Sequence, residues 1–145
     1  MVRSLAADLL AVAAGIDRMA KQRIRTPIGY AQARRLALIE RHGGVRISEL
    51  AALDHCSSPS TTVDVWLLVE AGLVSRTVDP EDARAVLVSI TPKGAATLRQ
   101  VRIDCGVAIN SDLNRIDAAD RRKLNDAVRV LQRLLDNTTA QSPTK

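Results

Sequence analysis

The stretch formed by residues 70–94 limits the fold of this chain more than any other. Residues 73–76 combine apolar Leu73 and Val74 with polar Ser75 and Arg76, and residues 85–90 are rich in β-branched side chains, so both runs favour β-strands. The segment between them holds Asp79, Pro80 and Asp82, a composition typical of turns. Because a lone β-hairpin is only marginally stable in water, this one must pack against helices.

Helical spacing of apolar residues occurs on both sides of the hairpin. Ser58 is expected to cap a helix that has Pro59 at its first position, and Asp117 is expected to cap the last helix. Gly43 and Gly44 end an earlier helix, and residues 45–47 are a candidate third strand. The predicted helices cover residues 2–20, 28–42, 48–53, 59–71, 91–112 and, in the C-terminal region, residues up to 138.

These elements predict a mainly α fold with a small antiparallel β-hairpin. Two short helices with a tight connection, over residues 48–53 and 59–71, are followed directly by the hairpin. That order is the winged helix-turn-helix, in which the second helix enters the DNA major groove.

Composition is consistent with this fold. The 145 residues are enough for one domain, and with an aromatic content of 1% the core must be aliphatic. A net charge of +5 fits a polyanionic partner without requiring one. The sequence shows neither a membrane span nor a signal peptide, so we expect a cytoplasmic protein in which Cys56 and Cys105 are free thiols.

Both end regions carry broad apolar stripes on their predicted helices. One stripe includes Leu5, Leu9 and Ile16, and the other includes Leu124 and Val128. The two helices can cover these stripes by packing within one chain or across a two-fold axis, and the pattern alone does not choose between these arrangements.

In combination, three motifs around the hairpin resemble the wing of the MarR family of bacterial transcriptional regulators. They are Glu70-Ala71-Gly72-Leu73-Val74, Asp82-Ala83-Arg84 and the run from Val86 to Gly94. The resemblance extends over residues 28–98, and more faintly over both ends. It implies a homodimer that binds double-stranded DNA at a pseudo-palindromic operator, acts as a repressor, and is released by a small anionic or phenolic ligand. It also implies one domain over residues 1–145, with a DNA-binding lobe at 28–94, dimerisation helices at 1–25 and 95–138, and a frayed tail at 139–145.

The same resemblance assigns roles at the tip of the wing. Arg84 is expected to reach the minor groove, and Asp82 to steady it. A narrow minor groove concentrates negative potential, which suits a guanidinium group. Many members of the family carry a further Arg where this chain has Ala83. The alternative is that Asp82 and Arg84 form only a surface ion pair, worth about 0–1 kcal/mol.

The helix predicted over residues 59–71 departs from the family because it contains no Lys or Arg. Counting back from Gly72 places Thr61, Val65 and Leu68 on its buried side. Asp64 should be repelled by phosphate, unless it accepts a hydrogen bond from cytosine or pairs with a basic side chain. The groove-facing side is expected to present Ser58, Ser60, Thr62, Val63, Trp66 and Leu67.

Two interpretations of this uncharged face remain open. In the first, the protein binds DNA mainly through its wing, its helix N-termini and peripheral Arg residues, with weak base readout. In the second, Val63, Trp66 and Leu67 contact a protein or a ligand, and specific DNA binding is reduced or lost. Trp66 has a third possible role, which is to fold back into the core.

Other chemistry has little support in the sequence. Cys56 precedes a helix N-terminus, which can lower a thiol pKa, but an inert thiol is the stronger expectation. His42, His55 and Cys56 lack the spacing of metal ligands, and we find neither a catalytic motif nor a cofactor-binding one. Arg18, Lys21, Arg34 and Arg35 are candidates for binding an anionic ligand, although we expect solvent-exposed positions for all four.

Overall fold

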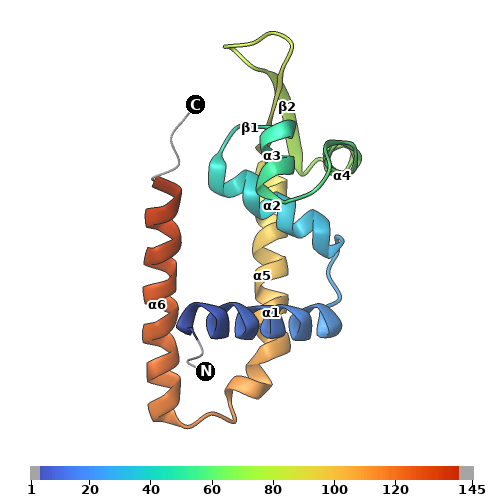
Figure 1. Ribbon diagram of the computed structural model, residues 1–145. Helices are drawn as coiled ribbons and strands as arrows, with labels where there is room; N and C mark the ends of the chain where they lie inside the picture. Colours follow the sequence, from blue (N-terminus) through green and yellow to red (C-terminus); the bar gives the residue numbers. More distant parts are fainter. Residues whose placement is uncertain (1–3, 141–145) are drawn as a thin grey trace. The chain divides into compact units, whose positions relative to one another are not determined.

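The computed structural model of the chain describes residues 4–140 and is mainly helical (Figure 1). Two compact units divide the chain, one within residues 1–108 and the other within residues 109–145. The helices are α1 (Leu5–Arg23), α2 (Tyr30–His42), α3 (Ile47–Leu53), α4 (Ser58–Glu70), α5 (Pro92–Leu113) and α6 (Ala118–Ala140). Within residues 4–140, no helix combines the length and hydrophobicity needed to cross a membrane.

A three-stranded antiparallel sheet supports the wing. It consists of β1 (Val45–Arg46), β2 (Val74–Val78) and β3 (Val86–Ile90), with β3 in the centre. Val45 pairs with Val88, which confirms the third strand predicted near residues 45–47. In the hairpin, Arg76 lies opposite Val88, so both side chains belong to the same face of the sheet. Figure 1 shows the β2–β3 hairpin projecting beyond the helices of the first unit.

The core of the first unit is aliphatic, as composition requires. Each element of the winged helix-turn-helix contributes at least one buried side chain, so the hairpin does pack against helices. The buried cluster comprises Leu36, Ile39, Val45, Leu50, Val65, Leu68, Leu73, Val74, Val88 and Leu98.

Two glycines are required by local geometry. Gly43, at the end of α2, has a φ of 69°, a conformation that L side chains rarely adopt. Gly94 lies in the first turn of α5, where an added Cβ atom would stand 2.0 Å from the carbonyl oxygen of Leu73. The close packing of α5 on the start of β2 therefore depends on the missing side chain of Gly94.

The second unit contains the C-terminal end of α5 and all of α6. Asp117 caps α6 as predicted, because its Oδ1 accepts a hydrogen bond from the backbone N–H of Asp120 at 2.8 Å. The backbone of α6 remains helical to Ala140, two residues into the predicted frayed tail, and residues 141–145 lie outside the described residues.

The start of α4 differs by one residue from the sequence prediction. Ser57, not Ser58, is the N-cap: its hydroxyl oxygen accepts a hydrogen bond from the backbone N–H of Ser60 at 3.4 Å. Ser58 is already helical, and Pro59 occupies the second position, where its missing N–H is also harmless. Two adjacent serines before a proline offer two possible caps, and the sequence alone could not distinguish them.

Candidate nucleic-acid interface

Helix α4 has a buried inner face and an exposed outer one. The inner face consists of Thr61, Val65 and Leu68, the three residues that the sequence predicted to be buried. Thr61 is accommodated there because its hydroxyl donates to the carbonyl oxygen of Ser57 at 3.0 Å. This burial fixes the rotation of α4, so the opposite side chains point away from the core.

The outer face of α4 presents apolar and hydroxyl groups. Val63 is 60% exposed, Trp66 51% and Leu67 46%, and Ser58 and Ser60 are exposed as well. Thr62 is half-buried, and its hydroxyl donates to the carbonyl oxygen of Ser58 at 2.8 Å. The oxygen of Thr62 keeps capacity only to accept a further hydrogen bond.

Trp66 does not fold back into the core. Its ring lies beside β2, where the guanidinium carbon of Arg76 is 5.3 Å from the ring centroid. This distance is within the range of cation–π interactions. The core interpretation of Trp66 is therefore wrong, and a cation from the sheet lies next to a helix that has none of its own. Sequence reasoning missed this contact, which joins residues on two different elements.

Asp64 is paired with a protein base, one of the two exceptions that the sequence allowed. Its Oδ2 accepts a hydrogen bond from Arg35 of α2. Arg35 is only 3% exposed, and its Nε lies 3.0 Å from Asp54 Oδ2. The expectation of a solvent-exposed Arg35 is therefore wrong. Because Arg35 neutralises Asp64, the carboxylate on α4 repels phosphate less than an unpaired one would.

Asp54 connects this ion pair to a second arginine. Arg34 Nε and Nη2 donate to Asp54 Oδ1 and Oδ2 at 2.5 and 3.1 Å, a two-pronged arrangement. Burial raises the pKa of Asp54, but the hydrogen bond from Arg34 and the charges of Arg34 and Arg35 outweigh it and hold the pKa below its ordinary value. We refer to Arg34, Arg35, Asp54 and Asp64 as the charge network; it links α2 and the C-terminal end of α3 to α4.

The turn of the wing is built around Asp79. This buried carboxylate accepts a hydrogen bond from the backbone N–H of Glu81 at 2.9 Å and another from Arg46 Nε at 2.7 Å. The first of these contacts lowers the pKa of Asp79, and together with Arg46 it outweighs the effect of burial. Sequence reasoning treated Asp79 only as a turn residue and missed its bond to β1.

At the tip of the wing, Asp82 steadies the backbone. Its Oδ1 accepts a hydrogen bond from the backbone N–H of Arg84 at 3.0 Å. Both residues are exposed. This contact holds the turn, and the Arg84 side chain extends from an ordered backbone.

The cysteines and histidines form no metal site. Within residues 4–140, no three His, Cys, Asp or Glu side chains are placed to hold a metal ion. Cys56 is half-buried, with its Sγ 4.0 Å from Arg34 Nη2. Burial raises the pKa of the Cys105 thiol, which disfavours the reactive thiolate.

A cavity of about 530 Å³ lies within the first unit, between the end of α1, the start of α2 and α5. Its wall combines apolar side chains, such as Ile24 and Val101, with Lys21 and Arg25. Tyr30 is also in the wall and donates a hydrogen bond to Asp17; burial and this bond raise the pKa of Tyr30 to about 12. The cavity therefore presents cations beside an apolar surface.

A short helix, a second helix with an exposed outer face and a projecting hairpin together define a winged helix-turn-helix protein. The sequence pattern of the MarR family matches residues 28–86, which run from just before α2 to the first residue of β3. Over these residues the chain matches the MarR family, and its relatives are DNA-binding transcriptional regulators.

Relatives extend the match over nearly the whole chain. An HTH-type transcriptional regulator of Mycobacterium leprae is 28% identical, over 92% of this chain and 94% of its own length. One of Mycobacterium bovis is 26% identical with the same coverage. The solved structure of the multiple antibiotic resistance repressor MarR is 26% identical, has a TM-score of 0.72, and covers 95% of this chain and 96% of its own. These similarities favour a DNA-binding regulator over the alternative of a winged-helix interaction module.

Proposed function

We propose that the protein acts as a homodimeric repressor that places two α4 helices in successive major grooves of a pseudo-palindromic operator. Ser58, Ser60, Thr62, Val63 and Trp66 face the bases and phosphates of each half-site. Asp82 and Arg84 form the tip of the wing, with Arg84 in the flanking minor groove. The observation that carries this proposal is the exposure of Val63, Trp66 and Leu67 on one face of α4, whose opposite face is fixed in the core.

Affinity in this arrangement comes from cations around α4, because α4 has none. Arg84 extends from the tip of the wing, Arg76 lies beside Trp66, and the whole chain carries a net charge of +5. Neutralising phosphates releases counterions, so binding should weaken steeply as salt concentration rises.

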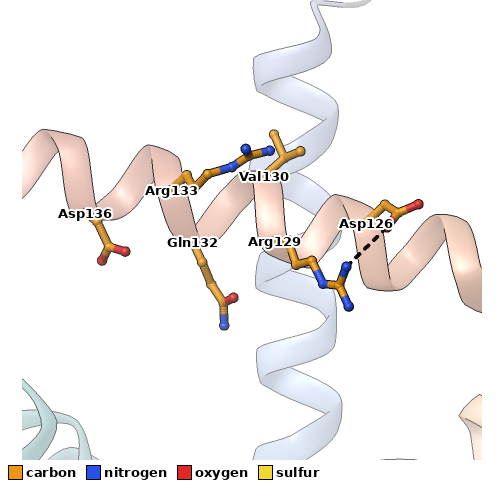
Figure 2. Close-up of a pocket in the computed structure, with 6 residues that line it drawn as sticks. All are labelled: Asp126, Arg129, Val130, Gln132, Arg133 and Asp136. Atoms are coloured by element: carbon orange, nitrogen blue, oxygen red, sulfur yellow. Dashed lines mark ion pairs between the residues drawn. The ribbon is translucent and has the colours of Figure 1, made fainter.

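The proposed homodimer rests on apolar side chains left exposed at both ends of the chain. α1 exposes Leu5, Leu10 and Val12, and α6 exposes Val128 and Leu134. These exposed apolar side chains on both end helices fit an interface with a second copy. Figure 2 shows a separate hollow of about 580 Å³ on α6, lined by Val130 and otherwise by charged or polar side chains of that helix.

We also propose that a small anionic or phenolic ligand regulates DNA binding from the 530 Å³ cavity. Lys21 and Arg25 suit an anionic group, and the apolar wall suits a small organic body. Titrating the protein–DNA complex with an aromatic carboxylate tests this step. Release of DNA by wild-type protein, and weaker release from an Arg25→Ala variant, would support it; DNA binding that the ligand leaves unchanged would count against the aromatic carboxylates.

The test of the function is binding to the DNA upstream of the protein's own gene, since repressors of this kind often act there. Binding to this DNA and to a scrambled duplex should be compared from about 50 to 200 mM salt, a range that separates specific from electrostatic binding. We expect the native sequence to be preferred throughout. The Arg84→Ala variant should lose affinity, whereas Arg99→Ala, which removes an exposed cation of α5, should not. Equal binding to the two duplexes would count against a specific regulator of that site.

A further inference from the structure

The outer face of α4 combines two features that the family assignment does not explain. Three large apolar side chains, Val63, Trp66 and Leu67, are about half exposed or more. They are adjacent on the helix surface, because residues three and four apart lie on one side of a helix. In the described part of the chain, no other element buries this patch.

Arg76 completes the same surface from the sheet. Val74 and Val88, on the face of the hairpin that carries Arg76, are buried, and Arg76 lies further along β2 towards the wing. Its guanidinium group sits over the Trp66 ring and has no carboxylate partner among residues 4–140. When the flat face of a guanidinium stacks on a ring, the N–H groups at its edge remain free to donate.

We propose that Trp66 and Arg76 act as one unit, in which the apolar patch of α4 selects thymine methyl groups while Arg76 binds a phosphate at the border of the same groove. This inference rests on the proposed DNA-binding function and adds the specificity that α4, a helix without Lys or Arg, can supply. The major groove exposes the C5-methyl group of thymine, and apolar side chains are its natural contacts.

The position of each group assigns its role. Val63, Trp66 and Leu67 are on the helix that enters the groove, so they meet base edges. Arg76 is on a strand beside that helix, so it meets the sugar-phosphate wall. A phosphate contact carries no sequence information, whereas a methyl contact discriminates thymine from cytosine and from uracil.

Replacing thymine by deoxyuridine tests the methyl contacts, because it removes only the methyl group and keeps base pairing. The duplex is the upstream site, and deoxyuridine replaces each thymine of one half-site in turn. For wild-type protein we expect about a fourfold loss of affinity at each contacted thymine, the factor that corresponds to one buried methyl group. The Trp66→Ala and Leu67→Ala variants should lose less affinity than wild-type protein when deoxyuridine replaces a contacted thymine.

The Arg76→Ala variant tests the phosphate contact. It should weaken binding to every duplex and reduce the slope of log Kd against log salt by about one. Arg76→Lys should keep the slope, since it keeps the charge, but alter the fluorescence of Trp66, because a lysine does not stack as a guanidinium does. Arg99→Ala, on α5, is the matched control and should leave the slope unchanged.

The outcomes separate this inference from the proposed function. If the native site is preferred over scrambled DNA but deoxyuridine has no effect at any position, the methyl contacts are refuted and the regulator stands. If Arg76→Ala leaves the salt slope unchanged, the phosphate contact is refuted. If wild-type protein does not distinguish native from scrambled DNA, the proposed function fails and this inference fails with it.

Discussion

Replacing Arg35 by methionine should destabilise the protein strongly without changing any residue of the outer face of α4. Methionine has a similar length but cannot pair with the carboxylates of Asp54 and Asp64. Arg35 is almost wholly buried between these two groups. The substitution therefore leaves a carboxylate on the recognition helix without its partner, in a site that excludes most water.

The magnitude follows from the burial of each partner. Removing one member of a buried ion pair costs about 3–5 kcal/mol. Asp54 keeps its bonds to Arg34, and the side chain of Asp64 is 26% exposed, so the low end of this range applies. A loss of about 3 kcal/mol corresponds to a fall in Tm of roughly 10 °C for a chain of this size.

Urea unfolding followed by circular dichroism, at one protein concentration, measures this loss. The matched control is Arg34→Met, since the Arg34 side chain is 43% exposed and Asp54 would keep Arg35; we expect about 1 kcal/mol. Removing the stranded charge in an Arg35→Met/Asp64→Leu double variant should recover about half of the loss. An Arg35→Met variant within 1 kcal/mol of wild type, with an unchanged m value, would refute the structural role of the charge network.

Three further predictions follow from the structure. Gly94→Ala should destabilise the protein by about 1–3 kcal/mol in the same urea assay, because the new Cβ atom meets a backbone carbonyl oxygen. Gly106→Ala is the control in the same helix: its Cβ atom would point into open space, so it should be neutral or stabilise by up to about 1 kcal/mol. The free energy of unfolding should stay constant from pH 7 down to about pH 5 and fall below about pH 4. The reason is that the folded-state pKa values of Asp54 and Asp79 are lowered, so acidification must protonate two carboxylates that the folded protein stabilises in their charged form. A urea midpoint that is equal at pH 7 and pH 3.5 would contradict this. Asp117→Ala removes the cap of α6 and should cost about 1 kcal/mol in thermal unfolding, whereas Asp117→Asn should cost little.

Local signals in the sequence were enough to predict most of the elements. The positive φ of Gly43 and the cap at Asp117 follow from residue types whose conformational preferences act over one turn. The buried positions of Thr61 and Val65 follow from helical periodicity counted from Gly72. These features could be predicted because each depends on residues close together in the chain.

The electrostatics of the site could not be predicted in this way. Arg35 and Asp64 are separated by 29 positions, and only the packing of α2 against α4 makes them partners. The exposed cation–π contact between Trp66 and Arg76 likewise depends on how β2 lies beside α4. His55 adopts a φ of 52° in the tight connection before α4, which no turn residue in the sequence indicated. Each missed feature depends on tertiary geometry, not on a local preference.

The most direct test of the central claim, that the outer face of α4 binds DNA, is the quenching of Trp66 fluorescence by acrylamide. Trp66 is the single tryptophan of the chain and is half exposed, so its emission reports on this face alone. We predict that saturation with the upstream DNA reduces the quenching constant severalfold, and that scrambled DNA at the same concentration and moderate salt does not. Tight, specific binding that leaves Trp66 fully accessible to acrylamide would contradict the claim, because the DNA would then lie elsewhere on the protein.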